Sequence, residues 1–139
     1  MGENERLLDA EALWSAGRRE GAVLMALVAV AAYASSAYPS VSADRDKFVA
    51  ALKDMHDWTI QLGYRGELID SDLFFYKYLR CSLVHEGELP PDVRIDSTFA
   101  DPESFALRAG GEPDLVVLVS PAWFHFFVNG LRAMLDARA

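Results

Sequence analysis

The feature that most constrains the fold is a long uncharged stretch rich in alanine. No Asp, Glu, Lys or Arg occurs from Gly21 to Ala43, and seven of the sixteen residues from Ala22 to Ala37 are alanine. A stretch of this length could cross a bilayer, but alanine contributes little transfer free energy. An acidic segment precedes it, whereas a secretory signal begins with a short basic segment. The pattern therefore favours a buried helix of a helical bundle over a membrane span or an export signal.

Composition and charge narrow the class of protein. The chain has 139 residues, of which 52% are hydrophobic and 24% charged, as expected for one globular domain spanning residues 1–139. The net charge of −8 is spread evenly, with −2 in each segment when the chain is divided at residues 40, 70 and 100. A nonspecific nucleic-acid binder or an anionic-membrane binder needs a positive field. We therefore expect neither membrane association nor sequence-specific DNA binding.

The cysteine and histidine content argues against a disulfide and against a metal site. Cys81 is the single cysteine, which excludes an intramolecular disulfide and fits the reducing cytoplasm. His56, His85 and His125 lie far apart in the sequence, and no two of them have the spacing of metal ligands. The sequence also lacks a glycine-rich phosphate loop. It therefore predicts a cytoplasmic protein without a metal or another cofactor.

Hydrophobic periodicity predicts four helices in the first 90 residues. They are expected over residues 5–16, over 19–37, from a cap at Ser42 to a point before Gly63, and over 72–85. Asp70 or Ser71 is expected to cap the fourth helix, and Gly87 to end it. Helices joined by short connections favour antiparallel neighbours.

The remaining third of the chain has a different pattern. Apolar and polar residues alternate over 93–96 and over 105–109, and residues 115–119 form a continuous run rich in β-branched residues. The last two segments are predicted to pair as a β-hairpin. Ser120 and Pro121 then form a strong start for a final helix. The predicted fold is an all-α, up-and-down bundle of four or five helices, with a small β-hairpin inserted at about 93–119 before the last helix.

The most informative motif lies in the fourth predicted helix, where Arg80 is followed five positions later by His85. The flanking residues are Leu79 before the arginine and Val84, Glu86 and Gly87 around the histidine. This pattern, late in a small helical bundle, resembles the HEPN superfamily. The opening of the chain, two helices joined through residues 17–22, is also similar to how such domains begin. The resemblance covers roughly residues 4–90 and the final helix, and the hairpin lies outside it.

The HEPN resemblance implies a function and a site. Members of the superfamily include metal-independent ribonucleases, many of them toxins or defence effectors, and also non-catalytic modules. The resemblance implies that Arg80 and His85 would be the catalytic pair, shared across a homodimer that acts on RNA. An antitoxin would be a further partner. The alternative is a non-catalytic dimeric module that binds a nucleotide, an RNA or a protein.

The residue types themselves also suit RNA cleavage. Attack by the 2′-hydroxyl requires a base, an acid for the leaving oxygen and positive charge near the phosphate. Histidine titrates near neutral pH, and arginine binds phosphate in a bidentate manner. One histidine per chain is too few for both proton transfers, but a twofold dimer supplies two. On an ideal helix Arg80 and His85 lie about 140° apart, so the helix must end near His85 or the partner must contribute.

Four further residues are candidates for supporting roles, and each has a structural alternative. Asp72 and Tyr76 precede Arg80 at four-residue steps. The three residues form either a ladder on one helix face that orients the guanidinium or a solvated stripe. Cys81 is either a buried small residue or a reactive thiol. Glu86 could pair with Arg80 in a purely structural arrangement. The superfamily often has Asn, Asp or His where this chain has Cys81, which favours the binding module over the nuclease.

Overall fold

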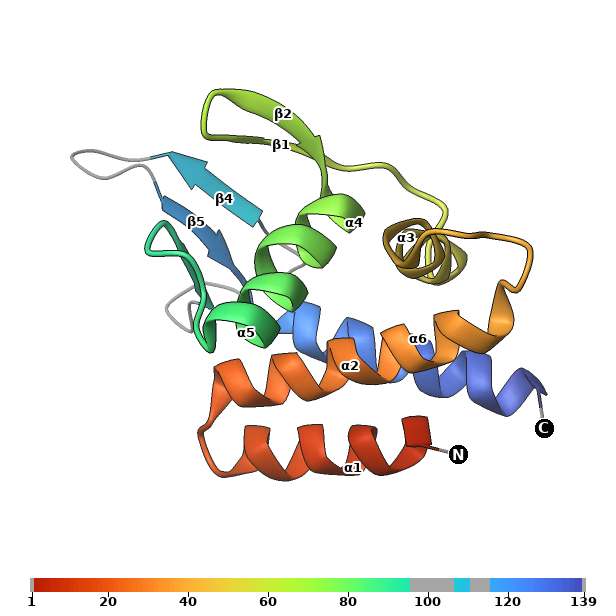
Figure 1. Ribbon diagram of the computed structural model, residues 1–139. Coiled ribbons are helices and arrows are strands. Elements are labelled where there is room, and N and C mark those ends of the chain that lie inside the picture. The colour runs from red at the N-terminus through yellow and green to blue at the C-terminus, as the bar shows by residue number, and fades with distance from the viewer. Residues whose placement is uncertain (1, 96–106, 111–115, 139) are drawn as a thin grey trace.

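The computed structural model describes residues 2–95, 107–110 and 116–138. Helix α1 (Gly2–Ser15) and helix α2 (Arg19–Ala37) form an antiparallel pair (Figure 1). The chain reverses at Gly17, whose φ of +79° favours a residue without a side chain. Ala22, Ala26 and Ala29 of α2 are fully buried, because small side chains allow close approach of a neighbouring helix. The predicted bounds of the alanine-rich helix are confirmed.

Helix α2 is also long and apolar enough to cross a membrane, judged by length and composition alone. In this fold eight of its residues are buried, and it contacts α1, the third helix and the last helix. Core helices of soluble proteins pass the same test of length and composition. The cytoplasmic location therefore stays a prediction.

Helix α3 (Asp44–Asp54) is shorter than predicted. It begins after Ala43, which is extended and provides no side-chain cap, so the predicted cap at Ser42 is wrong. Asp44 and Asp46 lie in the first turn, and Lys53 lies in the last. Each charge is favourable at its end of the helix dipole. Helix α3 therefore begins with a carboxylate close to the end of α2.

The structure contains a β-hairpin that the sequence does not predict, in the segment between the third and fourth helices. Strands β1 (Gln61–Tyr64) and β2 (Glu67–Asp70) pair in antiparallel fashion. Arg65 and Gly66 form the two-residue turn with φ values of +52° and +83°, as a type I′ turn requires. The prediction of an all-α bundle is therefore wrong in this region, and the fold is mostly helical with small sheets.

Residues 71–86 form one helical segment of three parts: α4 (Ser71–Phe74), the π-helix η1 (Phe75–Arg80) and α5 (Cys81–Glu86). The Asp70 side chain accepts a hydrogen bond from the Asp72 amide at 2.9 Å, which confirms Asp70 as the cap. Gly87 ends the segment with a φ of +75°. The predicted helix is confirmed. A π-helical turn holds more residues than an α-helical one, so its side chains point in different directions from those of an ideal α-helix.

A second sheet has the strand order β3-β5-β4. Strands β4 (Leu107–Gly110) and β5 (Val116–Val119) are antiparallel, and β3 (Val93–Ile95) runs parallel to β5. The predicted pairing before the last helix is confirmed, and the parallel pairing of β3 with β5 is an addition. The predicted strand residues 96, 105, 106 and 115 lie outside the described residues.

Helix α6 (Ala122–Arg138) completes the core. It passes along α2 (Figure 1). It also contacts α1, where Phe124 stacks on Trp14 at 4.2 Å and Arg132 pairs with Glu11 at 2.6 Å. A Cβ atom at Gly130 would meet the Met55 sulfur at 2.9 Å, so the glycine permits the close approach of the residue that follows α3. The largest fully buried side chains come from α1, α2, α3, α4, η1 and α6: Leu7, Leu27, Phe48, Leu52, Phe74, Phe75, Leu79, Trp123, Phe127 and Leu131.

Candidate functional site

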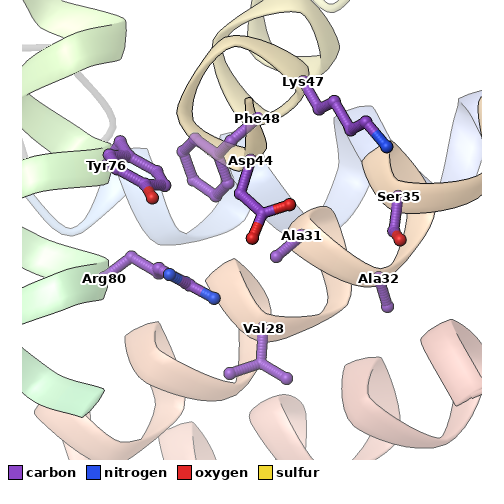
Figure 2. A pocket seen from close by; sticks show the side chains of 9 residues that line it. All are labelled: Val28, Ala31, Ala32, Ser35, Asp44, Lys47, Phe48, Tyr76 and Arg80. Carbon is purple, nitrogen blue, oxygen red and sulfur yellow. The ribbon is translucent and has the colours of Figure 1, made fainter. Parts of the chain in front are cut away.

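A solvent-accessible cavity of about 320 Å³ lies between α2, α3 and η1 (Figure 2). Three elements that are separated in the sequence contribute its walls. The lining side chains are Val28, Ala31, Ala32 and Ser35 of α2, Asp44, Lys47 and Phe48 of α3, and Tyr76 and Arg80 of η1. The alanine content of α2 leaves room on this face, and the polar groups of α3 and η1 converge above it. Few, convergent polar groups over an apolar floor are typical of ligand sites.

Arg80 is the most unusual group in this cavity. Its Nε atom is buried and has no hydrogen-bond partner among the described residues. Its Nη1 atom lies 3.8 Å from the Cys81 sulfur, and a thiol is a weak partner. The guanidinium carbon lies 5.5 Å from the centre of the Tyr76 ring. A guanidinium bound only in this way retains most of its donors for an acceptor that enters the cavity.

Two charged groups of α3 also line the cavity. Figure 2 shows the Asp44 carboxylate directed into the cavity between Arg80 on one side and Lys47 on the other. None of the ion pairs within the described ranges joins these three side chains. Arg80 and Lys47 contribute two positive charges and Asp44 one negative charge, so the cavity has a net positive charge of one.

Tyr76 contributes a protonated phenol to the rim. Burial raises the pKa of Tyr76, and the neighbouring Cys81 and Asp44 raise this pKa further, while Arg80 acts in the opposite direction. The phenol therefore stays a hydrogen-bond donor at neutral pH. Its ring packs against Phe48 with a centroid separation of 5.3 Å. Tyr76 thus closes one side of the cavity beside Arg80.

The structure does not bring His85 into this cavity. His85 is exposed in the last turn of α5, and the lining residues of the cavity do not include it. Val84 beside it is also exposed, at 46% of its surface. Within one chain, the predicted pair is therefore divided between a cavity and an outer surface.

Glu86 does not act as a partner of Arg80 in this chain. Among the described residues, the hydrogen bond of the guanidinium is to Cys81, and Glu86 is exposed. Glu86 instead lines a second hollow of about 240 Å³ together with Ser82 of the same helix and with Glu88, Leu89, Pro90 and Pro91 of the following segment. The proposed structural pairing of Arg80 with Glu86 is absent.

Asp72 belongs to a different cluster from Arg80. Its carboxylate lies 3.0 Å from the Nε2 atom of His56 and 3.3 Å from the Lys53 ammonium. The His56 and Asp72 side chains are 3% and 1% exposed, and the His56 ring stacks on Trp58 at 3.8 Å. Asp72 is therefore neither a support for the guanidinium nor part of a solvated stripe.

The sequence alone predicts no partner for His56, although Asp72, to which His56 binds, is one of the candidate residues. The β1–β2 hairpin explains the contact. Pairing of Gln61 with Asp70 places the residues before the hairpin beside those after it, and the Ser71 amide donates to the Ile60 carbonyl at 2.8 Å. Recognition of the two-residue turn at Arg65 and Gly66 would have predicted this contact.

Within residues 2–95, 107–110 and 116–138, no three His, Cys, Asp or Glu side chains are placed to hold a metal ion. Comparison with protein-family models, with curated proteins and with solved structures finds no match. The polar side chains that line the cavity are those of Arg80, Lys47, Asp44, Ser35 and Tyr76.

Proposed function

We propose that this chain binds a phosphate-bearing ligand, a nucleotide or an RNA end, in the Arg80 cavity. The observation that carries the proposal is the buried Nε atom of Arg80, which has no partner in the described residues. An unpaired buried donor costs about 1–3 kcal/mol, and a phosphate oxygen in the cavity would satisfy it. The planar guanidinium matches phosphate geometry better than any other side chain.

The neighbouring groups support the same ligand chemistry. Lys47 adds a second positive charge, and Ser35 and Tyr76 add hydroxyl donors. The cavity volume of about 320 Å³ lies at the lower end of the range of small-molecule sites. The resemblance of residues 79–87 to the HEPN superfamily also supports a binding module, since the superfamily includes non-catalytic members. Phosphate recognition is thus the function that this geometry supports best.

Isothermal titration calorimetry with adenosine 5′-monophosphate at low ionic strength tests the proposal. We expect saturable binding with one site per chain. Arg80→Gln keeps a polar side chain but shortens it and removes its charge, and it should weaken binding at least about tenfold, since hydrogen bonds to charged groups contribute about 1.5–3 kcal/mol. Lys77→Gln is the matched control because Lys77 is exposed on the same π-helix and does not line the cavity. Equal affinity of Arg80→Gln and Lys77→Gln would overturn the proposal.

A second candidate function is metal-independent cleavage of RNA by a homodimer. The observation that favours it is the exposure of His85 and Val84 at the end of the Arg80 helical segment. A second copy covering this surface would supply a second histidine, so that one imidazole accepts the 2′-hydroxyl proton and the other protonates the leaving oxygen. Arg80 would then stabilise the negative charge on the phosphate.

Cleavage of single-stranded RNA in the presence of EDTA tests this second function. We expect His85→Ala to abolish cleavage and His125→Ala to retain it, because His125 is exposed on α6 against Trp14. Equal activity of the wild type and His85→Ala would contradict the nuclease. Sedimentation equilibrium that gives only a 15.4 kDa species would contradict the homodimer.

A further inference from the structure

We infer that the occupant of the Arg80 cavity is a free ribonucleoside 5′-monophosphate, and that Asp44 selects it by accepting hydrogen bonds from the ribose hydroxyls. The inference rests on the proposed function, because it assumes that the phosphate binds to Arg80. It assigns a role to the Asp44 carboxylate, which phosphate binding alone does not explain.

The position of Asp44 is the first observation. Its carboxylate points into the cavity opposite the guanidinium (Figure 2), and no ion pair between described residues joins the two. A bare anion bound to Arg80 would therefore face the Asp44 carboxylate across the cavity. A ligand avoids this cost if it presents hydroxyl donors next to its phosphate, and the 2′- and 3′-hydroxyls of a ribose are such donors.

The charge of the cavity is the second observation. With Arg80, Lys47 and Asp44 as the charged lining groups, the net positive charge of one suits a monophosphate. A triphosphate would carry several further negative charges past the Asp44 carboxylate. The electrostatic balance therefore favours the nucleotide with the fewest phosphates.

The size and floor of the cavity are the third observation. Its volume of about 320 Å³ is bounded below by Val28, Ala31 and Ala32 and at the side by the Phe48 and Tyr76 rings. An apolar floor with aromatic edges suits one sugar and part of one base. The dimensions do not suit a run of stacked bases.

The same phosphate and ribose chemistry occurs at the 5′ end of an RNA chain. In RNA, however, the 3′ oxygen belongs to a phosphodiester, so it is no donor, and it brings a second negative charge close to Asp44. The carboxylate therefore favours the free nucleotide over the RNA end. The two sources are separate arms of the test.

Calorimetric titrations of the full chain with four probes test the inference: adenosine 5′-monophosphate, 2′-deoxyadenosine 5′-monophosphate, inorganic phosphate, and a tetraribonucleotide with a 5′-phosphate. We expect the ribonucleotide to bind about tenfold more tightly than the deoxynucleotide, since a hydrogen bond to a charged group contributes about 1.5 kcal/mol or more. In Asp44→Ala this ratio should fall to about one, and inorganic phosphate should bind more tightly than in the wild type.

Asp46→Ala is the matched control. It removes the same charge from the same first turn of α3, but Asp46 does not line the cavity and pairs with Arg45 on the surface. We expect it to keep the ribose preference. Circular dichroism of both variants establishes that each is folded before the titrations are compared.

The outcomes separate this inference from the proposed function. If binding depends on Arg80 but the ribonucleotide and the deoxynucleotide bind equally, phosphate recognition stands and the role of Asp44 is wrong. If the tetranucleotide binds as tightly as the mononucleotide, the RNA end is the occupant and the inference is wrong. If no probe binds in a manner that depends on Arg80, both the proposed function and this inference fail.

Discussion

One helical segment, residues 71–86, carries two opposite arrangements of charge. At its first turn, Asp72 is buried and bound to His56 and Lys53. Two turns later, Arg80 has a buried Nε atom without a partner in the described part of the chain, and it faces an open cavity. The Asp72 carboxylate has two partners within the chain, although the His56 Nδ1 atom is also buried without a partner among the described residues. The Arg80 guanidinium instead lies at a cavity that is open to solvent. This difference distinguishes a structural contact from a ligand site, although the residue types are similar.

Removal of Asp72 should produce the largest loss of stability. Asp72→Ala leaves His56 buried without its hydrogen bond and removes one anion from Lys53, so we expect a loss of about 3 kcal/mol. Urea unfolding followed by circular dichroism measures it. Asp57→Ala is the control, since Asp57 is exposed beside the same loop. A loss below about 1 kcal/mol would remove the contrast between the two arrangements.

A third contact joins the β1–β2 hairpin to Asp92, the residue before β3, and it is less buried than the contact of Asp72 with His56. Asp92 accepts hydrogen bonds from the Tyr64 hydroxyl at 2.6 Å and from Arg65 Nε at 3.0 Å. The Arg65 side chain is 54% exposed and that of Asp92 27%, so solvent screens the pair. We expect Asp92→Asn to cost about 1 kcal/mol at pH 7 in the same unfolding assay.

The Asp92 contact also predicts a pH dependence. The hydrogen bond from Arg65, and then that from Tyr64, lower the pKa of Asp92 below its ordinary value of 3.8, against the effect of burial. The stabilisation is therefore complete above pH 3.8 and is lost as the pH falls through the folded-state pKa. The stability difference between wild type and Asp92→Asn should shrink below about pH 4. A difference that grows on acidification would contradict this assignment.

Removal of Arg80 should produce the smallest loss of stability. Because its Nε atom is unpaired and its other contacts are a thiol and an aromatic ring, we expect Arg80→Gln to destabilise the fold by no more than about 0.5 kcal/mol. The same variant should lose nucleotide binding. Destabilisation equal to that of Asp72→Ala would show that Arg80 is a structural residue.

The sequence predicts the local elements better than the contacts between them. The bounds of α2 follow from its uncharged alanine-rich run and from Pro39, and the segment 71–86 follows from its caps at Asp70 and Gly87. The β1–β2 hairpin is not predicted from the sequence because its turn has Arg65 at a position that favours Asn, Asp or Gly. Contacts with Asp92 and with the Tyr64 and Tyr78 rings accompany this conformation, and they depend on the folded chain.

The candidate site is predicted only in part. Arg80 is marked by its spacing to His85, and Tyr76 by its position one turn earlier. Asp44 and Lys47 join the site because α3 packs beside the π-helix, which no local pattern indicates. The error about Asp72 arises because its carboxylate is held by His56 and Lys53, which come from a distant part of the sequence.

The most direct test of the central claim is a titration of the Arg80 Nε–H resonance with adenosine 5′-monophosphate, observed by ¹⁵N-resolved NMR. The account predicts a saturable shift of this resonance. The Nε–H of Arg65, which is already bound to Asp92 at 3.0 Å, should remain unchanged. An Arg80 resonance that stays in place at saturating nucleotide would contradict the claim that this cavity binds phosphate.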